Sequence, residues 1–551
     1  MSAPLLIAGM HRSGTSLVGS LVSQLGVDLG HDLVPADRNN ARGYHEDAGL
    51  VELHGELLGA ATGEAPEGHA DWGWTGSELV PGAALLPAIP RLQQAVAGRG
   101  PEPWGFKDPR TTVALDAWAE ALPEARFLLV YRFPWEVAAS MQRVGAEVFL
   151  RNPGWGAAIW TAYNQRLLDF RRRHRERCVV ACSNALPRGL EQLEELLRAA
   201  VPGLTGPRLD HEAFDPALFH GSDPEHSLAR IWSVAQPDAC DLLRALEEEA
   251  DVPSGLPWED PRPLLGTHRP EQPRVSVVVP VHDDGDLALD ALASYERTAS
   301  PDDELLVVND GSTDAGTLTL LERLEGAGYQ VLHKPQGGLS SARNHGFRAA
   351  RAPLVLPLDA DNLLRPLLLR EGVVHMADDP GCDVVYGDRQ LFGGQRRRVR
   401  IPPFELGSIL GGNNLDACAL MRRTLWERLG GYDEGMSGLE DWEFWIRAGA
   451  AGARFEQLSE VAQDYRVRPG SLLALSLAPA KRRALAEHVL AKHEGLLARH
   501  APWWLRPLTS LPGIGRPVNR TFWRLLWRLV GSGGLLKVMR ERRDPQDASR
   551  A

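Results

Sequence analysis

The sequence is poor in cysteine and has no long apolar run. Only five of its 551 residues are cysteines, and their spacing matches neither a paired zinc-ligand motif nor a disulfide framework. No uninterrupted apolar stretch approaches the roughly 18 residues that a membrane-spanning helix needs. The N-terminus also lacks the basic and then apolar segments of a signal peptide. Together these absences predict a protein of a reducing, cytoplasmic compartment.

An excess of positive charge is also missing. The net charge of -12 at pH 7 gives no basis for a nucleic-acid partner, and none is expected. Apolar residues make up 44% of the chain and charged residues 24%, which is typical of a globular protein. A chain of this length predicts about two to four domains, each large enough to bury a core.

A proline-rich stretch divides the sequence. It contains Pro253, Pro257, Pro261, Pro263, Pro270 and Pro273. Such a composition is typical of an interdomain linker. We therefore predict a first domain over residues 1–250, a linker over 251–273, a second domain over 274–478 and a tail over 479–551.

The second domain contains two carboxylates at the end of an apolar run. Residues 352–358 read as a buried strand, and Asp359 and Asp361 follow it directly. Side chains in this position meet at the carboxyl edge of an open sheet, where ligands bind. Two adjacent hard oxygen ligands suit Mg²⁺ or Mn²⁺, and these ions suit a diphosphate. The alternative is a solvated turn after a strand.

Three other segments accompany this pair in a fixed order. Residues 275–283 and 304–314 are apolar strands that end in polar turns, and residues 438–445 begin an acidic, aromatic helix. The set resembles the inverting family 2 glycosyltransferases of the GT-A fold, over roughly residues 274–475. The resemblance implies a Rossmann-like α/β domain, a nucleotide-sugar donor, and Mg²⁺ or Mn²⁺.

The same resemblance implies roles for individual residues. Asp441 matches the base that removes the acceptor's proton. Asp361 is assigned chiefly to the metal, and Asp359 to the ribose or to a metal-bound water. The nucleotide-binding residues that the family implies are Pro280, Asp310 and Arg343.

One position departs from the family pattern. Many members carry a metal-binding histidine near the end of the domain, and Arg468 stands at that place. Arginine cannot ligate a metal, although it can pair with a diphosphate. We therefore expect metal dependence to be weaker than is usual in the family.

The first domain begins with a phosphate-binding pattern. A short apolar strand, residues 5–8, precedes the glycine-containing loop 9–16 and a helical pattern over 17–25. This geometry points backbone N–H groups at an anion. Thr15 stands where nucleoside triphosphatases carry lysine, which argues against a kinase or GTPase. The cradle residues are Arg12, Ser13, Gly14, Thr15 and Ser16.

The loop and a second motif resemble sulfotransferases that use 3′-phosphoadenosine-5′-phosphosulfate (PAPS). In the second motif, Arg132 ends a predicted strand and Ser140 lies about two helical turns later. The resemblance assigns both to the 3′-phosphate of PAPS, and it implies a P-loop-like parallel sheet. A surface charge on Arg132 is the alternative.

Two further residues are candidates for the sulfuryl-transfer chemistry. Lys107 matches the lysine that neutralises charge on the transferring group, although it could instead pair with Asp108 in a turn. Glu46 matches the family's base, and His45 is the alternative base. Glu46 could also cap the following helix.

The tail combines basic and aromatic residues. Trp523, Leu526, Trp527 and Val530 fall on one helical face, and Arg520, Arg524 and Arg528 on another. This pattern predicts either peripheral contact with anionic lipid at the inner face of the cell membrane or a helix docked on the second domain.

The combined motifs predict a bifunctional transferase. One half would transfer a sulfuryl group from PAPS to a hydroxyl, and the other a sugar from a nucleotide sugar to a glycan or lipid-linked saccharide. The alternative is a glycosyltransferase whose N-terminal half is a noncatalytic nucleotide- or glycan-binding module.

Overall fold

The computed structural model describes residues 3–496 except for ten short gaps: 38–39, 41–42, 64–67, 101, 145, 210–226, 257, 259–262, 411 and 469–478. The amphipathic pattern predicted between residues 520 and 530 lies outside the described residues, and so does the rest of the tail after residue 496. Within the described part, no helix combines the length and apolarity required to traverse a lipid bilayer.

A four-stranded parallel sheet forms the centre of the N-terminal domain. Its strand order is β2-β1-β3-β4, with bounds β1 Leu5–Ala8, β2 Gly105–Lys107, β3 Arg126–Tyr131 and β4 Cys178–Cys182. All residues of β1 and β4 are buried, which explains why these strands are continuous apolar runs. The predicted α/β class with a parallel N-terminal sheet is confirmed.

Ten helices accompany this sheet in the described part of the domain. They are α1 Thr15–Gln24, α2 Ala48–Thr62, α3 Ile89–Ala95, α4 Leu115–Ala121, α5 Pro134–Val144, α6 Glu147–Arg151, α7 Trp155–Arg173, α8 Leu186–Ala200, α9 Ser227–Ala235 and α10 Pro237–Glu249. The predicted first helix is α1. The apolar positions of α7, including Ile159, Trp160 and Tyr163, are buried.

The C-terminal domain contains a mixed sheet with the order β7-β6-β5-β8-β12-β10-β13-β9, and β11 pairs with β10. The strands are β5 Val275–Val281, β6 Glu304–Asp310, β7 Val331–Lys334, β8 Leu354–Pro357, β9 Leu363–Leu364, β10 Val384–Gly393, β11 Arg397–Val399, β12 Leu420–Arg422 and β13 Phe455–Val467. The first four strands of the order run parallel, whereas β12 is antiparallel to both its neighbours. The α/β class is therefore confirmed here too.

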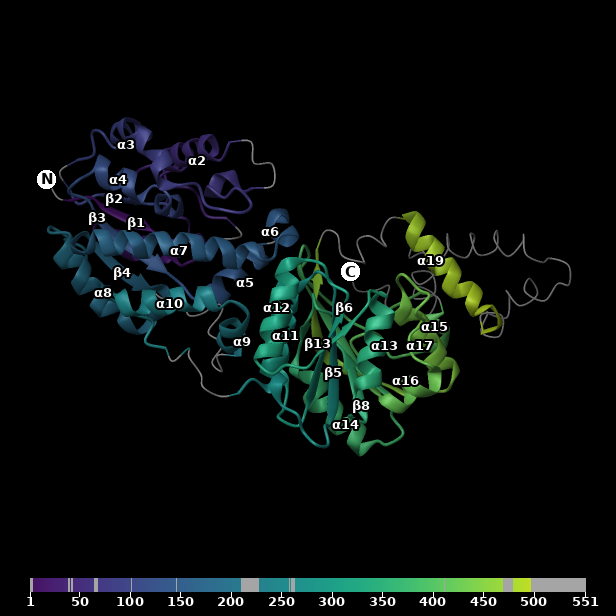
Figure 1. The fold of residues 1–551 in the computed structure, drawn as a ribbon. Helices are drawn as coiled ribbons and strands as arrows, with labels where there is room; N and C mark the ends of the chain where they lie inside the picture. The colour runs from purple at the N-terminus through teal and green to yellow at the C-terminus, as the bar shows by residue number, and fades with distance from the viewer. Residues whose placement is uncertain are drawn as a thin grey trace, which may run out of the picture.

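The helices of this domain are α11 Gly285–Thr298, α12 Ala315–Gly326, α13 Leu339–Ala349, α14 Val373–Asp378, α15 Leu406–Ile409, α16 Arg423–Leu429, α17 Glu440–Ala450 and α19 Pro479–Lys492. Helices α11 and α13 both contact β5. In Figure 1 the two domains lie side by side, and α9 of the first lies next to α11 of the second, in agreement with their direct packing.

The proline-rich connection is packed where the structure describes it. The backbone of Val252 exchanges hydrogen bonds with Val180 and Cys182 of β4, at 3.0 and 2.9 Å. Further along, the Glu296 carboxylate accepts hydrogen bonds from the N–H groups of Leu265 and Gly266, at 2.7 and 2.8 Å. These residues therefore hold the two domains together, unlike a flexible tether.

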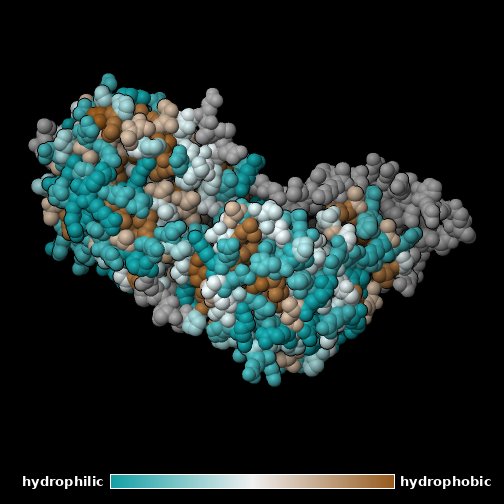
Figure 2. Space-filling model, in the orientation of Figure 1, coloured by the Kyte–Doolittle hydropathy of each residue, from teal (hydrophilic) through white to brown (hydrophobic). Residues whose placement is uncertain are grey.

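The two domains share one hydrophobic core. A single cluster of buried side chains includes Ile7 and Val130 of the first sheet and Val277 of the second, together with Leu292 of α11. A second cluster lies within the C-terminal domain, around Trp445 and Phe444 of α17. Figure 2 shows a visible face that is mostly hydrophilic, with apolar residues in small separate patches. Most of the apolar side chains of these two clusters are thus buried in the interior of the protein.

Candidate active sites

The N-terminal loop has the geometry of an anion cradle. Gly14 precedes α1 with a φ of +86°, a left-handed conformation that favours glycine. Gly9 lies so close to β3 that a Cβ atom there would be 2.3 Å from the Val130 oxygen. The Ser13 hydroxyl is fully buried and has no hydrogen-bond partner among the described residues. An orphaned hydroxyl at a helix N-terminus fits a phosphate oxygen.

The structure brings together the three residues predicted to grip the nucleotide's phosphates. Arg12 Nε donates to Ser140 Oγ at 2.9 Å, and Arg132 Nη1 donates to the Arg12 carbonyl at 3.3 Å. Glu136 accepts from Arg132 Nε at 2.7 Å and thereby orients that guanidinium. Arg132 is therefore part of a cluster at the carboxyl ends of β1 and β3, where ligands bind in α/β sheets.

Lys107 and Glu46 form a buried ion pair. Lys107 Nζ also donates to Ser16 Oγ at 3.1 Å, which connects the pair to the loop. Burial raises the pKa of Glu46 and lowers that of Lys107, and each charge offsets part of the shift in the other. A carboxylate with a raised pKa is a better proton acceptor near neutral pH.

Two alternatives for these residues are wrong. Lys107 does not pair with Asp108, whose carboxylate contacts His54 Nδ1 at 2.7 Å and accepts from Arg110 Nη1 at 3.1 Å. Glu46 does not cap the next helix, because Asp47 accepts the hydrogen bonds from the N–H groups of Gly49 and Leu50. His45, the alternative base, lies beside Glu46 in a left-handed backbone conformation.

In the C-terminal domain, Arg343 joins two segments of the predicted site. Its guanidinium donates to Asp359 at 2.5 Å and to Glu440 at 2.7 Å. Its side chain is only 2% exposed. Arg343 thus contacts the carboxylate pair after β8 and the start of α17, which also carries Asp441. The sequence predicted a nucleotide contact for Arg343 but not these two ion pairs.

Replacing Arg343 by methionine is expected to lower the free energy of unfolding by about 3–5 kcal/mol, because the buried Glu440 carboxylate and the half-buried Asp359 carboxylate would lose their partner. Chemical denaturation measures this change. Arg348→Met is the matched control, since Arg348 forms an exposed ion pair with Glu434 that contributes about 0–1 kcal/mol. Equal losses in the two variants would contradict the bridging role.

The second carboxylate of the pair lies next to Arg468. Arg468 Nε is 3.6 Å from Asp361 Oδ2, and its Nη2 donates to Asp284 at 2.8 Å. Burial, and then repulsion from Asp359, raises the pKa of Asp361 to about 6. Among the described residues no group of three or more His, Cys, Asp or Glu side chains could hold a metal. Two carboxylates completed by water and phosphate oxygens still suit Mg²⁺.

Asp441 lies in the first turn of α17. Asn413 Nδ2 donates to its Oδ2 at 2.9 Å. Burial, followed by the charges of Glu440 and Asp416, raises the pKa of Asp441 to about 7. Asn413 is a residue that sequence reasoning missed, because it lies 28 positions away in a loop without a motif. A carboxylate that titrates near neutral pH is suited to act as a general base.

The predicted nucleoside pocket differs in part from expectation. Pro280 lies in β5 beside Val308 of β6. The Asp310 carboxylate already accepts hydrogen bonds from the N–H groups of Gly337 and Gly338, at 2.9 and 2.7 Å. Asp310 therefore fixes the turn before α13. Its contact with a nucleoside stays a prediction.

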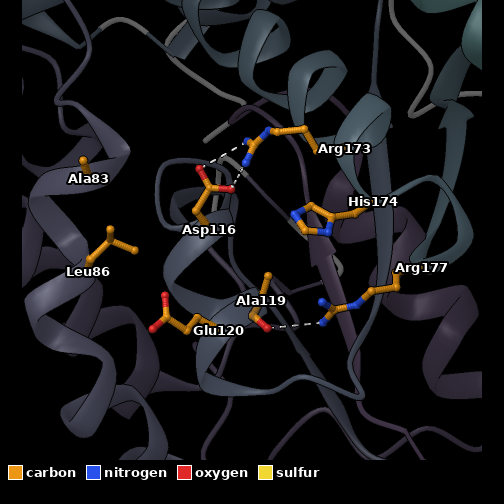
Figure 3. Close-up of a pocket in the computed structure, with 8 residues that line it drawn as sticks. All are labelled: Ala83, Leu86, Asp116, Ala119, Glu120, Arg173, His174 and Arg177. Atoms are coloured by element: carbon orange, nitrogen blue, oxygen red, sulfur yellow. Dashed lines mark hydrogen bonds and ion pairs between the residues drawn. The ribbon is translucent and has the colours of Figure 1, made fainter.

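A surface hollow in the N-terminal domain lies away from these residues. It has a volume of about 450 Å³, and Asp116 and Arg173 form an ion pair across part of its lining (Figure 3). Arg177, which also lines it, donates to the carbonyl of Ala125 just before β3. The hollow is thus at the amino edge of the parallel sheet, opposite the edge that carries Arg12 and Arg132. It contains none of the predicted site residues.

Comparisons with known families match the two domains separately. Residues 4–181 match the profile of the sulfotransferase family, and residues 276–438 match glycosyl transferase family 2. The family 2 match supports a nucleotide-sugar donor.

Relatives of the chain include several bacterial glycosyltransferases. The chain is 27% identical over 243 residues to the uncharacterized glycosyltransferase EpsJ of Bacillus subtilis, covering 41% of this chain and 69% of EpsJ. It is 29% identical to the Staphylococcus aureus poly(ribitol-phosphate) beta-N-acetylglucosaminyltransferase TarP, covering 26% of this chain and 44% of TarP. It is also 26% identical to protein y4gI of Sinorhizobium fredii, covering 51% of this chain and 30% of y4gI.

Among solved structures, S. aureus TarS in complex with UDP-GlcNAc is similar with 19% identity and a TM-score of 0.33, covering 42% of this chain and 78% of that one.

The family profiles match the two halves that the motifs distinguish. The chain is therefore a transferase that contains a sulfotransferase-family domain followed by a family 2 glycosyltransferase domain.

Proposed function

We propose that this protein transfers a sulfuryl group from PAPS in its N-terminal domain and a sugar from a nucleotide sugar in its C-terminal domain. The acceptor class that we propose is a bacterial surface glycan or a lipid-linked saccharide. One observation carries the PAPS assignment: the hydrogen bond between Arg12 and Ser140, with Arg132 on the Arg12 carbonyl. This cluster offers cations and a hydroxyl to a second phosphate, which PAPS has and ATP lacks at the 3′ position.

In the sulfuryl transfer, the acceptor oxygen attacks sulfur and the bond from sulfur to the phosphate oxygen breaks. The electron pair leaves with 3′-phosphoadenosine-5′-phosphate (PAP). Glu46 accepts the proton of the attacking hydroxyl, and its raised pKa supports that role. Lys107, held between Glu46 and Ser16, would neutralise negative charge on the sulfuryl group while it is transferred.

In the glycosyl transfer, the acceptor oxygen attacks the anomeric carbon opposite the diphosphate, and the bond from that carbon to the phosphate oxygen breaks. Attack from the face opposite the leaving group inverts the configuration at that carbon, and Asp441 accepts the acceptor's proton. Asp359 and Asp361 would hold Mg²⁺ or Mn²⁺, which stabilises the departing nucleoside diphosphate when bound. Arg468, next to Asp361, would supply part of the same positive charge, which supports a weakened metal dependence.

Calorimetry with PAP and with ATP tests the N-terminal assignment directly. We expect PAP to bind at least about 10-fold more tightly than ATP, because the cluster around Ser140 favours a 3′-phosphate. Arg132→Gln should remove most of this preference. Equal affinities for PAP and ATP would contradict the PAPS assignment and favour a noncatalytic nucleotide-binding module.

A further inference from the structure

Helix α5 presents three polar side chains on one face. Glu136, Ser140 and Arg143 are four and three residues apart, so they follow one another along the helix. Glu136 pairs with Arg132 and Ser140 accepts from Arg12. Arg143 therefore lies one turn beyond the two residues that the donor cluster already uses.

Arg143 lacks a hydrogen-bond partner in the described part of the chain, although the Glu136 carboxylate attracts it over a longer distance. It is half-buried, and it forms no hydrogen bond or ion pair with the residues that the structure describes. Its pKa is lowered to about 10, first by burial and then by three neighbouring cations: Arg132, Arg12 and Arg396. A half-buried guanidinium without a partner is costly, which points to a ligand that supplies the missing negative charge.

The last of these cations comes from the other domain. Arg396 lies on the hairpin between β10 and β11, and β10 packs against α5. At the same end of β10, a Cβ atom on Gly393 would lie 3.6 Å from Leu150 of α6. Arg466 of β13 reaches Gln142 of α5 at 3.4 Å. The hairpin therefore lies close to α5 and α6, and Arg396 is near enough to Arg143 to act on its charge.

The charges in this cluster do not balance among the described residues. Four guanidinium groups gather here: Arg12, Arg132, Arg143 and Arg396. Two carboxylates oppose them: Glu136 pairs with Arg132, and Asp37 attracts Arg12. Four positive charges against two negative ones leave two positive charges without compensation. The guanidinium group of arginine matches the geometry of the oxygens of a phosphate monoester. Such a dianion would compensate the remaining positive charge.

We propose that the glycosyltransferase domain completes the donor site of the sulfotransferase-family domain: Arg143 and Arg396, from different domains, jointly hold the donor's 3′-phosphate monoester. This inference rests on the proposed use of PAPS. It adds two residues beyond the predicted motif, one of them from the other side of the domain boundary. A sulfotransferase-family domain expressed without the hairpin would thus lack one of its phosphate ligands.

The test compares full-length Arg143→Gln and Arg396→Gln with the matched control Arg397→Gln. Arg397 is the next residue of the same exposed hairpin and carries the same charge. We expect PAP affinity to fall about 10-fold or more in Arg143→Gln and about 3-fold in Arg396→Gln, and to stay unchanged in Arg397→Gln. Binding of adenosine 5′-phosphate, which lacks the 3′-phosphate, separates the 3′-phosphate contact from general anion attraction, and we expect it to be equal in all proteins.

Two further results make the test decisive. Arg143→Gln should raise the melting temperature of the ligand-free protein, since it removes a half-buried charge, and this also shows that the variant folds. Equal PAP affinity of Arg396→Gln and Arg397→Gln would overturn the cross-domain site alone. A wild type that binds PAP no better than adenosine 5′-phosphate would overturn the use of PAPS and this inference with it.

Discussion

Replacing Asp441 by asparagine is expected to reduce glycosyl transfer about 10²–10⁴-fold, which is the usual contribution of a general base. Asn413, which donates to the Asp441 carboxylate, can donate to the new amide oxygen in the same way. The nucleotide-sugar affinity should therefore change little. Steady-state transfer rates together with calorimetry of the donor separate these two effects. Asp379→Asn is the control, because Asp379 is an exposed carboxylate paired with Arg454.

The pH dependence provides a second measurement of the same group. A base must be deprotonated, so the wild-type rate should rise with pH and level off above about 7, the raised pKa of Asp441. The folded state also holds this proton more tightly than the unfolded chain, so ionising Asp441 costs stability as the pH rises from about 4 to 7. Asp441→Asn should accordingly melt at a higher temperature than the wild type at pH 8. A variant that keeps the wild-type rate would exclude Asp441 as the base.

Replacing Lys107 by methionine is expected to reduce sulfuryl transfer by about 10²–10³-fold, because the charge on the transferring group loses its cation. The same change leaves the Glu46 carboxylate buried without its partner, which should lower the free energy of unfolding by about 3–5 kcal/mol. Labelled PAPS and urea denaturation measure the two effects.

The double variant Lys107→Met, Glu46→Gln separates stability from chemistry. Removing both charges should restore much of the lost stability, because no unpaired buried charge remains. Activity should stay lost, since the proposed base is absent as well. Arg91→Met is a suitable control, because Arg91 and Glu56 form an exposed ion pair that contributes about 0–1 kcal/mol. Recovery of sulfuryl transfer in the double variant would exclude both roles.

The strands that carry the motifs could be predicted closely from the sequence. The apolar run over residues 5–8 is β1, and those ahead of the acidic turns are β5, β6 and β8. These strands are buried on both faces, so each is a short continuous apolar segment with a polar end. The motif residues at their ends could therefore be assigned to the carboxyl edges of two sheets.

The contacts between distant segments could not be predicted in this way. Lys107 and Glu46 are separately recognisable, but their ion pair depends on how β2 and the start of α2 meet. The sequence around Arg343 does not indicate its hydrogen bond to Glu440, which is 97 residues away. The part of the second sheet around β12, β10 and β13, where antiparallel and parallel pairing meet, has mixed exposure along β10 and β13. Its pairing depends on the whole fold rather than on local pattern.

The core that runs without interruption from one sheet to the other sets the separation of the two reaction centres. Two enzymes joined by a flexible linker adopt many relative orientations, so an intermediate can pass between them along many routes. Here packed side chains fix the orientation of each centre relative to its neighbour. A saccharide that is modified at both reaction centres must therefore be long enough to span the fixed distance between them. A shorter saccharide must dissociate from the first centre and bind again at the second.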